Sequence, residues 1–203
     1  MKKEKWDIFF EQKIAEISKR DKILDIGGGN GFQKNLKKFQ PLFSNSHYRS
    51  FDIEGTGAQI VGDIHHIPLA DGSEDAVICN AVLEHVFEPI RAVEEIYRIL
   101  KPGGVALIQV PSTYPYHGNK GYGDNPGYGD YWRFFEGTLR YIFRHFSSVE
   151  IVRQGSYFRA MITFLPIKIL NKHTTDRLAR ILDKTFKTER RNTTKGYYVY
   201  ATK

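Results

Sequence analysis

The sequence predicts an α/β fold in which a mostly parallel sheet carries helices on both faces. Short apolar runs alternate along the chain with segments of helical periodicity, and this alternation is typical of parallel sheets. The run at 75–82, "DAVICNAV", is nearly all apolar, as expected for a strand that is buried on both faces. Four glycines follow the first apolar run, "KILDI", at a strand end, where open parallel sheets bind their ligands.

The periodicity predicts the other elements in chain order. Residues 4–18 have apolar residues at helical spacing and are expected to form an amphipathic helix. Helices are also expected at 33–39, ending before Pro41, and at 88–100. The latter is expected to end at "KPGG", where a glycine can take the left-handed conformation that closes a helix. The expected strands are 22–26, 47–53, 58–64, 75–82 and 105–110.

Length and composition indicate a single domain over 1–203. A chain of 203 residues with 41% hydrophobic residues can bury one core. It has no apolar run of about 18 residues that could span a membrane, and its start lacks the apolar core of a signal peptide. Cys79, the only cysteine, is interpreted as a small buried apolar residue. We therefore expect a cytoplasmic protein.

The glycine cluster at 27–31 excludes two common nucleotide-binding patterns. A dinucleotide fingerprint needs G-x-G-x-x-G, but its third glycine would fall at Phe32 or Lys34. A P-loop would need a glycine where Gln33 stands. What remains is a D-x-G-x-G-x-G pattern, formed by Asp25, Gly27, Gly29 and Gly31.

This stretch resembles the first motif of the class I S-adenosylmethionine-dependent methyltransferases, and the likeness extends over about residues 20–145. "FDIEG" is similar to the end of their second strand, and "LEHV" and "RILKPGG" are similar to motifs of the small-molecule branch. "GYYVYATK" resembles their final strand. The resemblance implies a methyltransferase with a Rossmann-like, doubly wound, mostly parallel seven-stranded sheet whose last strand is antiparallel. Glu74 stands where relatives commonly have Phe, which we interpret as a change at a surface corner.

The resemblance also implies S-adenosyl-L-methionine as cofactor and assigns its binding residues. The loop glycines would line the methionine and ribose parts, and they are Gly27, Gly28, Gly29 and Gly31. Asp25 would orient this loop or contact the methionine amino group, although it could equally serve only to bind loop N–H groups.

Three further positions complete the predicted cofactor site. Asp52, with its neighbour Ile53, would accept hydrogen bonds from the ribose hydroxyls. Asp63 would accept the adenine amino group, while Ile64 beside it supplies a main-chain N–H. Asn80 would lie beneath the methionine end, with a simple strand-end turn as the alternative.

Methyl transfer from a sulfonium is an in-line displacement, so the protein mainly has to align the acceptor and exclude water. A hydroxyl acceptor would also need a general base, and His117 in "YPYHG" is the candidate, with an ordinary surface histidine as the alternative. No metal site is expected, because the adjacent histidines His65 and His66 are poorly placed to chelate one ion. His85 is interpreted as part of the pocket floor or of the following turn.

The acceptor is predicted to be a small molecule or a lipid-linked or sugar-linked metabolite. Nucleic-acid amino-methylating enzymes have [DN]-P-P-[FYW] after the fourth strand, where this chain has "NAVL", so nucleic acid is not expected. The aperiodic stretch 111–133 is expected to cover the acceptor with Tyr114, Tyr116, Tyr131 and Trp132. The alternatives are a non-catalytic cofactor- or partner-binding protein on the same fold, and an RNA methyltransferase that uses the basic C-terminal segment.

Charge is concentrated near the C-terminus. Residues 1–150 have 18 Lys and Arg against 20 Asp and Glu, whereas residues 151–203 have 12 against 3, a net charge of +9. We expect a helical insertion at about 156–190, between the last two strands of the domain. In it, the apolar residues Leu178, Ile181, Leu182 and Phe186 face away from the basic residues Arg177, Arg180, Lys184 and Lys187. Such a helix indicates peripheral membrane contact, or else a lid or a homodimer contact.

Overall fold

A seven-stranded sheet forms the centre of the computed structural model, which describes residues 3–119, 128–165, 172–188 and 193–203. The strand order is β3-β2-β1-β4-β5-β7-β6, and only β7 runs antiparallel to its neighbours. This confirms the predicted fold class. The strands are β1 (Lys22–Ile26), β2 (His47–Asp52), β3 (Ile60–Val61), β4 (Glu74–Asn80), β5 (Leu100–Pro111), β6 (Ser148–Gln154) and β7 (Gly196–Thr202).

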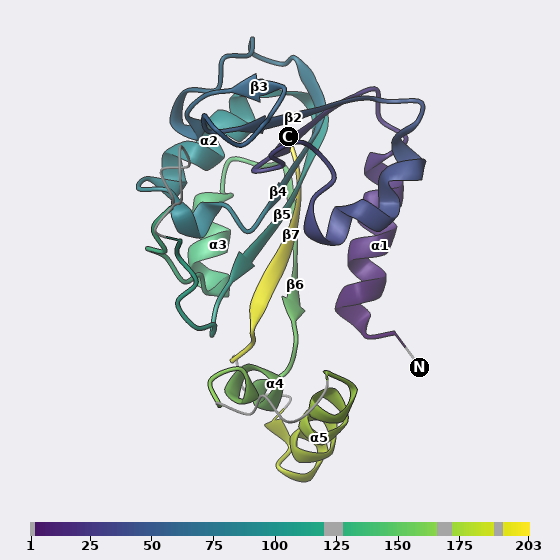
Figure 1. Ribbon diagram of the computed structural model, residues 1–203, viewed down its shortest axis with the longest axis vertical. Coiled ribbons are helices and arrows are strands. Elements are labelled where there is room, and N and C mark those ends of the chain that lie inside the picture. The colour runs from purple at the N-terminus through teal and green to yellow at the C-terminus, as the bar shows by residue number, and fades with distance from the viewer. Residues whose placement is uncertain (1–2, 120–127, 166–171, 189–192) are drawn as a thin grey trace.

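Helices cover both faces of the sheet (Figure 1). On one face lie α1 (Lys5–Ile17) and the 3-10 helix η1 (Lys34–Phe43), and on the other lie α2 (Pro89–Ile99) and α3 (Glu136–Ile142). Neighbouring residues of β4 enter opposite cores, Ile78 beneath α1 and Cys79 beneath α2, and both are fully buried. The strand is therefore buried on both faces as predicted, and burial raises the pKa of the Cys79 thiol well above its ordinary value.

Two local predictions were wrong. The segment after the glycine loop is helical as predicted, in the 3-10 form, but it continues through Pro41 to Phe43 instead of ending at 39. The buried side chains of Leu36 and Phe43 attach both ends of this segment to the core, so tertiary packing outweighs the proline signal. Helix α2 ends at Ile99, within one residue of the predicted end, but no glycine closes it: Leu100 is the capping residue, and Gly103 takes its left-handed conformation (φ +73°) inside β5.

Glu74 is not at a surface corner. Its side chain is fully buried at the start of β4, and its Oε1 lies 2.5 Å from Nη2 of Arg49 in β2. A carboxylate removed from water needs such a partner, since an unpaired buried charge is costly. Arg49 reaches it from across β1, so the two side chains form an ion pair inside the sheet.

Helices α4 (Tyr157–Ile162) and α5 (Lys172–Thr185) lie in sequence between β6 and β7. Pro111 at the end of β5 and Gln154 at the end of β6 are both paired with Gly196 at the start of β7. The two helices therefore extend from the carboxyl edge of the parallel strands, as Figure 1 shows. Among the described residues, no helix combines the length and apolar composition needed to cross a bilayer.

Candidate functional site

The glycine loop after β1 is held against the end of β2. Gly27 has φ +74° and donates its N–H to the Phe51 carbonyl, 2.8 Å away. A Cβ at Gly27 would stand 2.3 Å from Cγ2 of Val82, so a side chain has no room there. The N–H of Gly29, which has φ +49°, donates to Oδ2 of Asp52 at 3.0 Å. The predicted glycine and acidic positions are therefore brought together.

Tyr48 is a site residue that the sequence reasoning missed. Its hydroxyl donates to Oδ2 of the buried Asp25 and accepts the N–H of Phe32 at 3.0 Å. Its ring stacks on the Phe32 ring with centroids 3.9 Å apart. The same Asp25 oxygen would lie 2.6 Å from a Cβ at Gly28, which explains the bare glycine. Asp25 thus fits the loop-orienting role, while its contact with a methionine amino group stays a prediction.

A cavity of about 260 Å³, here called the Asp52 cavity, opens beside this loop. It contains five of the predicted cofactor positions, namely Gly27, Asp52, Ile53, Asp63 and Ile64. Apolar side chains complete it, including Phe51, Val82 and Phe87. A polar end with one carboxylate and an apolar slot suit a ribose and a flat base, respectively.

Asp63 begins the short 3-10 helix η2 (Ile64–His66) and already has partners there. Its Oδ1 accepts the His65 N–H at 2.9 Å and lies 2.6 Å from Nδ1 of His65. Partial burial would raise the pKa of Asp63, but these two contacts lower it below its ordinary value. His65 is half-buried rather than exposed, and its Nε2 accepts the N–H of Glu88 at the start of α2. The adjacent histidines therefore have structural partners.

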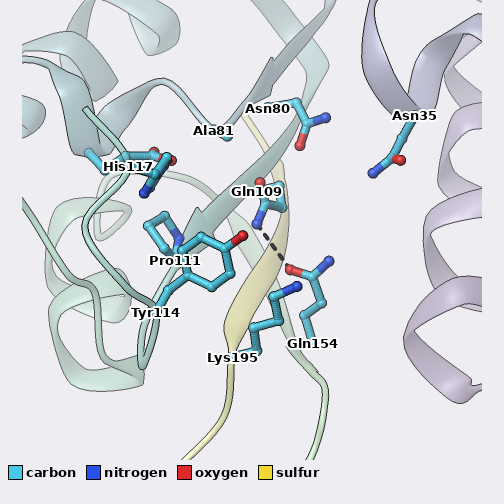
Figure 2. A pocket seen from close by; sticks show the side chains of 10 residues that line it. Asn35, Asn80, Ala81, Gln109, Pro111, Tyr114, His117, Gln154 and Lys195 are labelled. Atoms are coloured by element: carbon cyan, nitrogen blue, oxygen red, sulfur yellow. Dashed lines mark hydrogen bonds and ion pairs between the residues drawn. The ribbon is translucent and has the colours of Figure 1, made fainter. Parts of the chain in front are cut away.

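A second cavity, of about 220 Å³, lies at the ends of β4 and β5 and is here called the His117 cavity (Figure 2). Figure 2 shows Gln109 hydrogen-bonded to Gln154, with Tyr114 and Lys195 beside them. Asn80 lines this cavity rather than the Asp52 cavity. Sequence reasoning missed most of its polar lining, because these residues come from distant segments: Asn35, Glu84, Gln109, Gln154 and Lys195.

His117 is held in place by an acidic partner. The backbone N–H of His117 donates to Oδ2 of Asp130 at 2.8 Å, and the ring nitrogen Nδ1 lies 3.2 Å from the same oxygen. Arg133 binds both Asp130 oxygens, at 2.5 and 2.6 Å. The Arg133 hydrogen bonds, aided by the His117 N–H and opposed by burial, lower the pKa of Asp130 to about 2. Asp130 is therefore a carboxylate at neutral pH and keeps Nδ1 of His117 as a donor.

Among the aromatic residues of the 111–133 stretch, one lines the His117 cavity and two attach the stretch to the loop after β4. Tyr114 lines the His117 cavity, as predicted, but Tyr116 is 74% exposed and is not among the lining residues. Trp132 instead donates its indole N–H to the Val86 carbonyl, and the N–H of Tyr131 donates to the Glu84 carbonyl. These two contacts attach the stretch to the loop after β4. Residues 120–127 of the predicted cover lie outside the described residues.

Comparison with known proteins relates part of the chain to methyltransferases. Residues 24–108 match the family model described as methyltransferase domain. Arsenite methyltransferase of Halobacterium salinarum is 31% identical over 120 residues, which are 51% of this chain and 30% of that protein. A crystal structure of an S-adenosylmethionine-dependent methyltransferase from Archaeoglobus fulgidus superposes with a TM-score of 0.63 at 16% identity, covering 97% of this chain and 92% of that one. Phosphoethanolamine N-methyltransferase 2 of Haemonchus contortus, solved with S-adenosylhomocysteine, has a TM-score of 0.54 at 16% identity, covering 95% and 53%.

The sheet order and the structural matches define an α/β protein with the Rossmann-like methyltransferase fold. The part of the chain that matches the methyltransferase model contains the glycine loop and Asp52, and the fold is that of solved methyltransferases whose cofactor is S-adenosylmethionine. Its matches cover between 20% and 44% of the length of the curated relatives, so the acceptor does not follow from them.

The residues present fit this cofactor. The Asp52 cavity offers a carboxylate at the end of β2 and a second one after β3, separated by apolar side chains. A Cβ at Gly27 would collide with Val82 and one at Gly28 with Asp25, so only glycine keeps the loop in this position beside the Asp52 cavity. Asp52 and Asp63 would therefore bind the nucleoside of the cofactor, and the loop from Gly27 to Gly31 would bind its methionine part. These individual roles stay predictions.

Proposed function

We propose that this protein transfers the methyl group of S-adenosylmethionine to a small-molecule acceptor that is linked to a lipid or a sugar. The supporting observation is that the loop after β4 contributes to two cavities at once. Val82 and His85 line the Asp52 cavity, while Ala81 and Glu84 line the His117 cavity. A cofactor in the first cavity and an acceptor in the second would meet across this loop, which is the arrangement that direct transfer requires.

The chain's own residues align and prepare the acceptor. S-adenosylmethionine, when bound, supplies an electrophilic methyl group that needs no further activation. His117 turns its Nε2 toward Glu84 in the His117 cavity, while Asp130 and the Pro115 carbonyl lie at its Nδ1. An imidazole held in this way can take the proton of an acceptor hydroxyl at Nε2. His117 is the catalytic residue of the proposal.

The cavity lining favours an acceptor rich in oxygen atoms with a negative group. Gln109, Gln154 and Asn35 present amides that can bind hydroxyls from several sides. Lys195 lies with its ammonium 4.9 Å from the Tyr114 ring centroid at the edge of the same space. A sugar or a phosphate-linked headgroup has this combination of hydroxyls and charge.

The direct test has two stages. Isothermal titration of the full chain with S-adenosylmethionine and S-adenosylhomocysteine should show one site for each. Extract of the source organism, incubated with the protein and methyl-labelled S-adenosylmethionine, should then yield a labelled small molecule or lipid. Binding without transfer to any extract fraction would favour the non-catalytic alternative, and label in RNA would favour the RNA methyltransferase. Absence of cofactor binding would overturn the proposal.

Replacing Asp52 by Ala should weaken S-adenosylmethionine binding by about 10–100-fold. The variant removes the acceptor of the Gly29 N–H and, in the proposal, of the ribose hydroxyls. Losing a hydrogen bond to a charged group and leaving its partners unpaired costs about 1–3 kcal/mol. Asp21→Ala is the matched control. Asp21 is exposed and pairs with His47, which begins β2, whereas Asp52 ends that strand. Equal affinities of the two variants would remove the role assigned to Asp52.

The surface of α5 supports a lipid-linked acceptor in particular. Leu178 and Ile181 are 39% and 54% exposed, whereas Leu182 is half-buried and Phe186 packs against Phe158, so part of the predicted apolar face is uncovered within the described residues. Arg177 and Lys184 are exposed on the same helix. Because α5 lies at the edge of the sheet that holds the His117 cavity, we propose that this face rests on an anionic lipid surface and brings the cavity to it.

Vesicle binding checks this attachment. The protein should sediment with vesicles that contain phosphatidylserine and phosphatidylglycerol, but not with neutral phosphatidylcholine vesicles, and salt should release it. Arg177→Glu combined with Lys184→Glu should prevent sedimentation, since each basic residue near such a surface contributes about 1 kcal/mol. The control with an equal charge change is Lys22→Glu with Lys37→Glu, on exposed positions of β1 and η1. A stable dimer in light scattering, without vesicle binding, would contradict the proposal and favour the homodimer.

A further inference from the structure

We infer that Glu84, His85 and His117 form a binding site for one divalent transition-metal ion, at the wall of the His117 cavity. The inference rests on the proposed function, because the ion would bind the acceptor there. It also differs from the sequence analysis, which expects no metal and considers only His65 and His66. The three residues converge from two segments that are far apart in the chain: Glu84 and His85 from the 3-10 helix η3 (Leu83–His85), and His117 from the loop after β5.

The spacing of the three side chains suits one ion. Oε1 of Glu84 lies 3.4 Å from Nε2 of His117 and 3.7 Å from Nε2 of His85. One ligand atom from each residue lies within 4.8 Å of the other two. Ligands about 2.1 Å from a common ion at octahedral or tetrahedral angles are about 3.0–3.5 Å apart. Small side-chain rotations therefore suffice to bring all three atoms to one ion.

Each histidine is oriented with its Nε2 toward the carboxylate. Nδ1 of His85 lies 2.5 Å from the carbonyl oxygen of Gly129, which can only accept, so this nitrogen carries a proton. Nδ1 of His117 likewise faces the Asp130 carboxylate at 3.2 Å and the Pro115 carbonyl at 3.3 Å. With Nδ1 as the donor, a neutral imidazole presents a lone pair at Nε2. This is the outer-shell arrangement that prepares histidines for metal ligation.

The carboxylate is also held in place before any ion arrives. The Glu84 side chain is 1% exposed, and its backbone carbonyl accepts the N–H groups of Tyr131 and Trp132 at 2.8 and 3.2 Å. Leu83 beside it is fully buried in the core. A dication placed among these three atoms would be bound by one carboxylate oxygen and two imidazole nitrogens.

Two histidines and one carboxylate define the kind of ion and its use. This ligand set favours Zn²⁺, Fe²⁺ or a similar first-row ion over Mg²⁺ or Ca²⁺, which prefer oxygen ligands alone. Three protein ligands leave coordination positions open toward the His117 cavity. An acceptor with two adjacent oxygen atoms, such as a vicinal diol, could occupy them, and the ion would lower the pKa of the bound hydroxyl. In that case His117 serves as a ligand, and the proton leaves to solvent.

Metal titration of the full chain tests the inference without knowledge of the acceptor. After removal of metals by chelation, Zn²⁺ should bind with one equivalent in isothermal titration, and Co²⁺ should give visible absorption bands that Zn²⁺ abolishes. Glu84→Gln and His117→Gln should each weaken Zn²⁺ binding by at least tenfold. His117 is only half-buried, so its variant serves should the buried Glu84 variant fail to fold. His47→Gln, at an exposed histidine paired with Asp21, should bind like the wild type.

Cofactor titrations of the same samples separate this inference from the proposed function. Zn²⁺ binding that is absent, or unchanged in both ligand variants, would overturn the metal site. S-adenosylmethionine binding would then still stand, with His117 as the proton acceptor. Site-specific Zn²⁺ binding in a protein that fails to bind S-adenosylmethionine or S-adenosylhomocysteine would support the metal site and overturn the proposed function.

Discussion

Replacing Gly29 by Val should abolish S-adenosylmethionine binding while the protein stays folded. Gly29 has φ +49°, a left-handed conformation that β-branched residues strongly disfavour. A Cβ added at position 29 would lie 2.1 Å from the Gln33 amide nitrogen and 3.4 Å from the Thr56 carbonyl oxygen. The Gln33 side chain can move aside, but the left-handed φ and the contact with the Thr56 carbonyl remain, and we expect the loop to shift and to weaken the Gly29 hydrogen bond to Asp52. Titration gives the affinity, and circular dichroism monitors the fold.

A second glycine provides a control for the effect of backbone strain alone. Gly103 also has a left-handed conformation, with φ +73°, but a Cβ there would meet nothing within 4 Å. Gly103→Val therefore imposes a comparable conformational cost inside β5, away from the proposed cofactor site. It should bind S-adenosylmethionine with wild-type affinity. Retained binding by a folded Gly29→Val protein would mean that the glycines serve only the turn.

The sequence was sufficient for features that depend on short segments. The glycine loop and Asp52 could be predicted because each follows directly from one strand end, and parallel strands bring their carboxyl ends to one edge. The structure places Gly27 and Asp52 around one cavity accordingly. By contrast, η1 was misjudged because Pro41 is a local signal, whereas the burial of Leu36 and Phe43 depends on a core built by distant residues.

Residues that act through long-range contacts could not be found in this way. Tyr48 lies within β2 and looks like an ordinary strand tyrosine, but its hydroxyl reaches Asp25 in the neighbouring strand. Lys195 precedes the last strand, and it meets the His117 cavity only because β7 inserts beside β5. Glu84 and His117 likewise approach through the folded loop after β5. Their pairing depends on Asp130 and the backbone of Tyr131, to which no local pattern points.

Replacing His117 by Gln should lower methyl transfer by about 10²–10⁴-fold while S-adenosylmethionine affinity stays unchanged. General base catalysis contributes a factor of this size, and glutamine has a similar length but cannot take up a proton near neutral pH. Ligation of an ion would also be lost with the imidazole. His117 lines the acceptor side of the site and is not among the residues of the Asp52 cavity, so cofactor binding should persist.

The measurement follows release of S-adenosylhomocysteine at saturating acceptor, once the labelled product has identified that acceptor. His47→Gln is the control. The His47 side chain is 78% exposed, and its ring pairs with the exposed Asp21. Asp130→Asn should show an intermediate loss, since it weakens the acceptor that holds Nδ1 of His117 while the imidazole remains. Turnover within threefold of the wild type in His117→Gln would remove His117 from the mechanism and leave alignment in the His117 cavity as the source of catalysis.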